Sequence, residues 1–177
     1  MMLILTGNKG CGKSLLLKGL IADNDVSVQG FLSLKRFTGP DVTGIELLLF
    51  PDRKIIPMAT TTPITTEAST SRFYFYPDVF SRVNMHFNKL SQDRCFVFDE
   101  FGLLEMKREG HYPIFEQLIK SGNKSLIVVR SLLLDDFLSS FCLDIQHAVI
   151  DLEKYRLDHA STVILDFLTT QPGKNPG

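Results

Sequence analysis

The chain has few cysteines, no tryptophan and almost no net charge. Its 177 residues include three cysteines, and the formal net charge is −1. Cys11, Cys95 and Cys142 lie far apart and form no C-x-x-C pair, so the sequence indicates neither a zinc site nor a disulfide framework. A nearly neutral chain has no global field that would attract nucleic acid. A polyanion must therefore bind at a local site.

Long apolar runs are also missing. No segment reaches the roughly 18 uninterrupted apolar residues that a membrane-spanning helix needs, and the run at 2–5 is too short for a signal peptide. We therefore expect a cytoplasmic protein without a membrane segment. Hydrophobic residues make up 44% and charged residues 22%, which is typical of a globular protein. Without a repeat or linker, the sequence predicts a single domain over 1–170 and a flexible tail at 171–177.

The strongest motif follows the first apolar run. Residues 7–14 read GNKGCGKS, which matches the G-x-x-x-x-G-K-[ST] pattern of a phosphate-binding loop, and three leucines follow. Glycine lets the backbone curve around an anion, and the amides at the start of the next helix favour negative charge. We expect Lys13 to reach the β- and γ-phosphates and the Ser14 hydroxyl to bind Mg²⁺. The predicted nucleotide-binding residues are Gly7, Asn8, Lys9, Gly10, Cys11, Gly12, Lys13, Ser14 and Leu15.

The rest of the chain alternates apolar runs with helical patterns. Such alternation predicts an α/β fold in which helices cover both faces of a mostly parallel sheet. Two runs at 45–50 and 55–59, separated by a turn, predict an inserted antiparallel hairpin. The threonine-rich segment 60–71 is expected to be an exposed loop. The predicted strands are 2–5, 29–34, 72–76, 95–98, 126–129 and 148–152, and the predicted helices are 13–22, one that begins at 77–78, 112–120, 132–141 and 158–168.

Acidic and basic side chains follow two of the predicted strands. Asp99 and Glu100 come directly after the apolar run 96–98, and Arg130 follows the run 126–129. Because ligands of open α/β sheets bind beyond the carboxyl ends of the strands, these residues are expected near the phosphate loop. Asp99 is the predicted Mg²⁺ partner, acting from outside the direct ligands or through a water molecule, and Glu100 is placed to activate a water molecule for attack on the γ-phosphate. Arg130 would stabilise the developing charge, although an ordinary surface ion pair fits this arginine equally well.

With these residues identified, the chain resembles the small nucleoside-triphosphatases first described from thermophiles, also called cancer-related nucleoside-triphosphatases. The resemblance rests on the phosphate loop, on Gly30 and Phe31, on 98–102 with Leu104 and Glu105, and on 128–130. Leu103 and Leu104 stand where the family usually has Pro and Met. The resemblance implies a three-layer, RecA-like P-loop fold and Mg²⁺-dependent hydrolysis of several nucleoside triphosphates to diphosphate and phosphate.

Three functions remain open at this stage. The first is a nucleoside-triphosphatase that hydrolyses ATP, GTP and other nucleoside triphosphates with little base selectivity, because the N-K-x-D motif that reads guanine is missing. The second is a kinase that transfers the γ-phosphoryl group to a small molecule or a nucleic-acid end, with an arginine-rich lid expected near 60–71. The third is a nucleotide sensor whose loops change order with the bound phosphate. The protein partner of such a sensor is unknown from the sequence.

Overall fold

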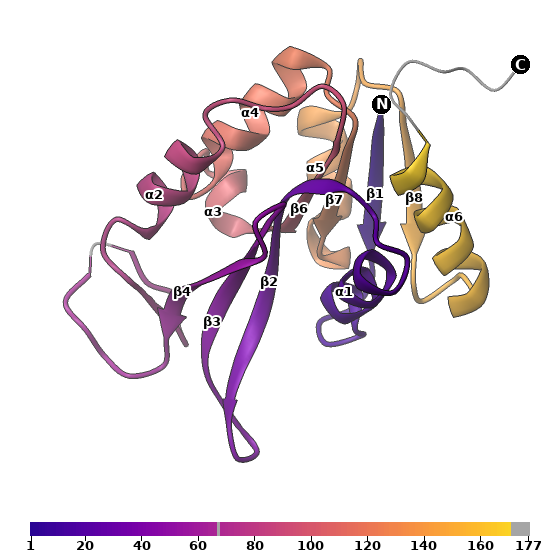
Figure 1. Cartoon of the computed structure of the whole chain (residues 1–177). Helices are drawn as coiled ribbons and strands as arrows, with labels where there is room; N and C mark the ends of the chain where they lie inside the picture. The colour runs from indigo at the N-terminus through magenta and orange to yellow at the C-terminus, as the bar shows by residue number, and fades with distance from the viewer. Residues whose placement is uncertain (67, 171–177) are drawn as a thin grey trace, which may run out of the picture.

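One mixed sheet organises the molecule. The computed structural model describes residues 1–66 and 68–170, and its strands form an eight-stranded sheet in the order β5-β4-β3-β2-β6-β7-β1-β8 (Figure 1). Strands β2, β6, β7, β1 and β8 run parallel, so their carboxyl ends share one edge. The strands are β1 (Met2–Thr6), β2 (Val28–Thr38), β3 (Asp41–Phe50), β4 (Lys54–Thr60), β5 (Tyr74–Phe75), β6 (Cys95–Phe101), β7 (Ser125–Val129) and β8 (His147–Asp151).

Helices cover both faces of this sheet. On one face, α1 (Lys13–Asp23) and α6 (Leu157–Thr169) pack against a core that includes Leu5 and Leu17. The opposite core is rich in phenylalanine and includes Phe98. All five residues of β1 are buried, which explains its continuous apolar sequence. The helices on the second face are α2 (Val79–His86), α3 (Leu103–Met106), α4 (Tyr112–Ser121) and α5 (Leu134–Phe141).

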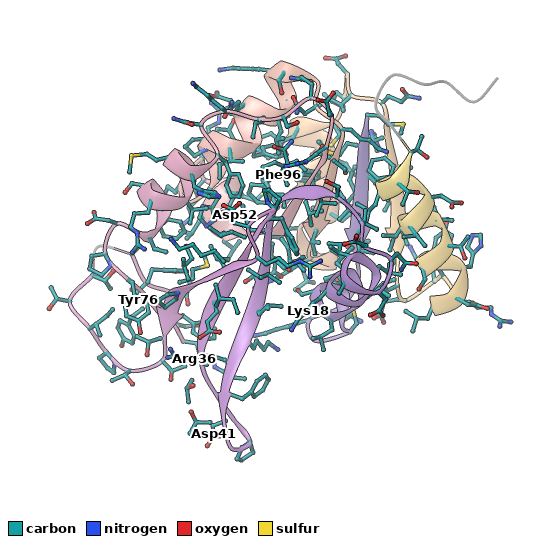
Figure 2. All side chains as sticks on the ribbon, in the orientation of Figure 1. Lys18, Arg36, Asp41, Asp52, Tyr76 and Phe96 are labelled. Carbon is teal, nitrogen blue, oxygen red and sulfur yellow. The ribbon has the colours of Figure 1, made fainter. Side chains whose placement is uncertain are left out.

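The inserted antiparallel part is larger than a single hairpin. Strands β2, β3, β4 and β5 form a meander in which each strand pairs antiparallel with the next. Strand β2 was expected to end at Leu34 but continues to Thr38. Its pairing with β6 ends at Phe31, whereas its pairing with β3 continues to Thr38 and keeps the later residues extended. The β2–β3 hairpin therefore extends past the carboxyl edge, and Figure 2 shows Arg36 and Asp41 on this projecting part.

The predicted fold class is confirmed, with local corrections. The helix expected over 132–141 begins as a 3-10 turn at Ser131–Leu133 and is α-helical only from Leu134. The strand expected over 72–76 shortens to two residues, and the sequence did not predict α3. The tail at 171–177 lies outside the described residues. Within the described part of the chain, no helix has the length and apolar character that crossing a membrane requires.

Candidate active site

The phosphate loop connects β1 to α1 at the carboxyl edge of the sheet. Gly12 precedes the helix with a φ of 92°, a left-handed conformation that favours glycine. The helix then begins at Lys13, and the Leu16 amide donates to the Gly12 carbonyl at 2.8 Å. Amides in the first turn have no acceptor within the helix, so those of Lys13, Ser14 and Leu15 are suited to bind an anion. Leu15 is 70% exposed, and its apolar side chain has no donor for an anion, so only its backbone amide can serve that purpose.

Lys13 folds back over the loop. Its side-chain ammonium donates to the carbonyl oxygens of Gly7 at 2.8 Å and Asn8 at 2.9 Å, and to the sulfur of Cys11 at 3.5 Å. The residue is only 7% exposed although it carries a charge. The loop therefore holds a positive charge against its own backbone carbonyl oxygens. The side chains of Lys9 and Cys11 lie at the exposed rim.

Asp99 meets the phosphate loop from β6. This carboxyl group is 1% exposed, and its Oδ2 atom accepts a hydrogen bond from the Ser33 amide at 3.0 Å. The Ser14 hydroxyl lies close enough to the same carboxyl group to lower its pKa. Burial raises the pKa of Asp99 to about 7, although the Ser14 and Ser33 hydrogen bonds act in the opposite direction. The structure thus brings together the two residues that the sequence assigned to the metal.

The chemistry of this pair fits a magnesium ion. A hydroxyl and a carboxylate are hard oxygen donors of the kind that Mg²⁺ prefers. A buried carboxylate is also costly unless a positive charge compensates it. No group of three or more His, Cys, Asp or Glu side chains in the described part of the chain could form a metal site by itself.

Glu100 and Arg130 form an ion pair at the same edge. The Arg130 Nε atom donates to Oε1 of Glu100, and its Nη2 atom donates to Oε2 at 2.9 Å. The two side chains are 29% and 42% exposed, respectively, and the carboxylate raises the pKa of the guanidinium. The residues meet because β6 and β7 are neighbours in the sheet. The expected water-activating group and the expected charge-stabilising group therefore contact each other.

Sequence reasoning missed several side chains around these residues. Glu105 is buried in the short helix that follows β6, and its carboxylate accepts hydrogen bonds from the Gly102 amide at 2.9 Å and the His111 amide at 3.0 Å. These bonds hold the turn that follows β6. Glu153 follows β8 and contacts the phosphate loop. The rule that selected Arg130, a polar residue just after a parallel strand, would also have found Glu153.

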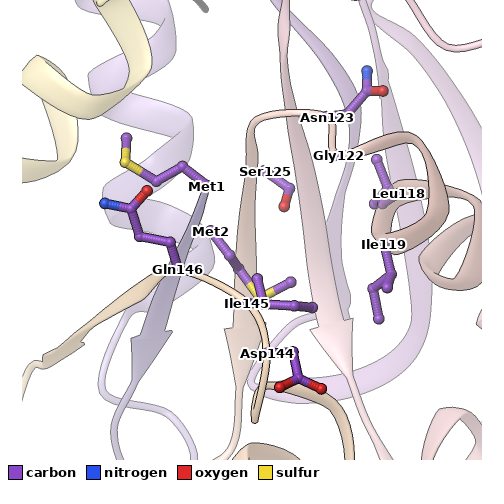
Figure 3. A pocket seen from close by; sticks show the side chains of 10 residues that line it. All are labelled: Met1, Met2, Leu118, Ile119, Gly122, Asn123, Ser125, Asp144, Ile145 and Gln146. Atoms are coloured by element: carbon purple, nitrogen blue, oxygen red, sulfur yellow. The ribbon is translucent and has the colours of Figure 1, made fainter. Parts of the chain in front are cut away.

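The pocket in Figure 3 lies elsewhere. It is lined by Met2, Ser125 and Gln146, which stand at or next to the amino ends of β1, β7 and β8. The phosphate loop stands at the carboxyl ends of the same strands. The pocket therefore lies at the opposite end of these strands from Lys13 and does not belong to the site described above.

Comparisons with known proteins agree with this fold. A sequence model of the NTPase family matches residues 2–164. The crystal structure of THEP1 from the hyperthermophile Aquifex aeolicus is similar, with a TM-score of 0.73 and 15% identity over 96% of this chain and 100% of that chain. The solution structure of a human cancer-related nucleoside triphosphatase has a TM-score of 0.63 and 16% identity over 93% of this chain and 95% of that chain. Comparison with curated proteins gave no match. Since the family model spans nearly the whole chain, the resemblance carried by the motifs is confirmed: the chain belongs to the NTPase family, and its activity is that of a nucleoside triphosphatase.

Proposed function

We propose that this enzyme uses Mg²⁺ to hydrolyse ATP, GTP and other nucleoside triphosphates to diphosphate and phosphate, with little base selectivity. The observation that carries the proposal is the proximity of Ser14 of the phosphate loop to the buried carboxyl group of Asp99. It places hard oxygen donors beside a loop of backbone amides and the Lys13 ammonium. A magnesium-bound triphosphate is the ligand that matches all three kinds of group.

Each residue then has a separate task. The backbone amides of 10–15 and the Lys13 ammonium bind the phosphate oxygens, and Ser14 and Asp99 hold the metal. Bound Mg²⁺ would supply positive charge that neutralises the β- and γ-phosphates. Glu100 orients the attacking water and accepts its proton, and the Arg130 guanidinium stabilises negative charge on the γ-phosphoryl group.

The test measures phosphate release with Mg²⁺ and ATP, GTP, CTP or UTP in turn, and repeats each reaction with EDTA. We expect comparable turnover with all four substrates and none with EDTA. Lys13→Ala should abolish turnover and weaken nucleotide binding. The control is Lys18→Ala, which removes an exposed lysine of the same helix. Selective turnover of one nucleotide would contradict the proposed substrate range, and turnover with EDTA would contradict the metal requirement.

Glu100→Gln separates binding from chemistry. The amide keeps the shape of the side chain but is a far weaker base, so binding should persist while most turnover is lost. Glu116→Gln, an exposed position on α4, makes the same change of charge elsewhere on the molecule. Turnover of Glu100→Gln at the parent rate would show that another group activates the water.

The kinase alternative gains no support from the position of the expected lid. The segment 60–71 follows β4, and β3, β2, β6 and β7 lie between β4 and β1 in the sheet. It also contains no arginine. The same phosphate-release assay, run without any acceptor, distinguishes hydrolysis from transfer. Binding without turnover would instead favour a nucleotide sensor.

A further inference from the structure

The second residue of the phosphate loop is held from both sides. The Asn8 side-chain amide donates to Oε2 of Glu153 at 2.8 Å, and its backbone amide approaches Oε1 of the same carboxylate at 3.4 Å. On the other side, the Ser131 hydroxyl donates to Oδ1 of Asn8 at 3.2 Å. Every polar atom of the Asn8 side chain thus contacts a residue more than 100 positions away in the sequence.

The two partners come from the strands on either side of β1. Glu153 follows β8, and its own amide donates to the Asp151 carboxylate at 3.0 Å. The preceding residue, Leu152, continues the sheet pairing by donating to the Thr6 carbonyl at 3.1 Å. Ser131 follows β7 and is adjacent to Arg130. Rigid strands therefore support both contacts.

The loop gains order from such supports. Glycine occupies three of its eight positions, and glycine loses more conformational freedom on ordering than any other residue. Amides that bind phosphate act best when they already point to the place where charge develops. A carboxylate near a polyanion is electrostatically unfavourable, so the contact of Glu153 with the loop needs a compensating benefit. Holding Asn8 in place supplies this benefit, because it orders the glycine-rich loop before phosphate binds.

We infer that Glu153, assisted by Ser131, is a positioning residue that holds the phosphate loop in its phosphate-binding conformation through Asn8. The inference rests on the proposed function, because it assigns a role in the same nucleotide site. Glu153 touches no phosphate in this role and acts only through Asn8. The Ser131 contact also connects the loop to the end of β7, where Arg130 stands.

Steady-state hydrolysis of Mg²⁺–ATP by four variants tests this role. Glu153→Ala removes the acceptor and should lower kcat/KM by about 10- to 100-fold, because displacing catalytic groups by about 1 Å can cost about 100-fold. Glu153→Gln retains an oxygen that can accept from the Asn8 side chain, so it should stay within about twofold of the parent. Asn8→Ala also removes the Ser131 contact, so it should lose at least as much as Glu153→Ala. The double variant should lose no more than Asn8→Ala alone, because the Asn8 substitution already removes the side-chain contact with Glu153.

Two controls make the result specific. Glu116→Gln removes one negative charge from α4, on the opposite face of the sheet from α1, and should leave kcat/KM unchanged. Thermal unfolding without nucleotide should be nearly the same for all variants, since Glu153 and Asn8 are exposed. If Glu153→Ala stays within twofold of the parent, or if the two single losses multiply in the double variant, the inference is wrong. A parent enzyme that does not turn over Mg²⁺–ATP would refute the proposed function instead.

Discussion

A buried histidine, His111, makes the stability of this enzyme depend on pH. His111 is 2% exposed, and its ring packs against those of Phe31 and Phe80, each with centroids 4.9 Å away. The Nδ1 atom lies 3.4 Å from the Asn84 side-chain oxygen, whereas Nε2 has no hydrogen-bond partner among residues 1–66 and 68–170. Burial lowers the pKa of His111 from 6.5 to about 3. The folded protein therefore keeps this imidazole neutral throughout the mildly acidic range.

The direction and size of the effect follow from proton linkage. Below pH 6.5 the unfolded chain binds a proton at His111 and the folded chain does not, so stability falls as the pH is lowered from 6.5 towards 3. At pH 5 the loss from this residue is about 2 kcal/mol, and at pH 7.5 it is less than about 0.1 kcal/mol. For a chain of this size, 2 kcal/mol corresponds to a change in Tm of about 4–8 °C.

Thermal or urea unfolding of His111→Phe at pH 5 and pH 7.5 measures this term. Whatever the substitution does to packing, the stability of the variant relative to the parent should be about 2 kcal/mol more favourable at pH 5 than at pH 7.5. Phe137→Leu is the matched control, because this buried ring packs against Phe101, Phe115 and Phe141 rather than against His111, and the cost of its substitution should be equal at both pH values. A difference for His111→Phe below about 0.5 kcal/mol would refute the argument.

Three further predictions concern the loop, the sheet and the ion pair. Cys11 is exposed beside Lys13, whereas the other two cysteines are buried, so a thiol reagent should label Cys11 alone. Bound Mg²⁺–ATP should slow this labelling, and equal labelling rates with and without nucleotide would show that the nucleotide binds elsewhere. Gly30→Ala should lower the free energy of unfolding, measured by chemical denaturation, by about 3 kcal/mol or more. The new Cβ would lie 2.1 Å from a backbone oxygen of β6, and residue 30 has a φ of 109°, which favours glycine; an unchanged unfolding midpoint would contradict this. Arg130→Ala and Glu100→Gln should together reduce kcat by less than the product of their separate effects, and multiplying losses would argue against coupling.

The sequence predicted those parts of the site that local chemistry determines. The glycines and the lysine of the phosphate loop specify a backbone conformation and a charge within eight residues, and alternating apolar runs predict the parallel sheet around them. The carboxyl-edge rule then placed Asp99 and Arg130 on the same side as the loop, which is where the structure has them. Their catalytic roles stay predictions.

Features that depend on pairing between distant segments could not be predicted. The order of strands decides that β7 lies between β1 and β6, and hence that Arg130 reaches Glu100. No spacing in one sequence encodes that contact. The length of β2 depends on how long β3 continues beside it, and the contact of Glu153 with the phosphate loop depends on the pairing of β8 with β1.

The ion pair at the end of β6 and β7 bears directly on how hydrolysis can proceed. A guanidinium that binds a carboxylate through two hydrogen bonds has little charge left for a phosphoryl group, and a carboxylate in the same pair is a weak base. Both proposed roles therefore require Arg130 to leave Glu100. A γ-phosphate carries more negative charge than one carboxylate, so its arrival favours transfer of the guanidinium from the carboxylate to the phosphate. That transfer would free Glu100 as a base only when a triphosphate is present. The two residues thus act as one unit, which is the physical reason to expect that their substitutions do not combine independently.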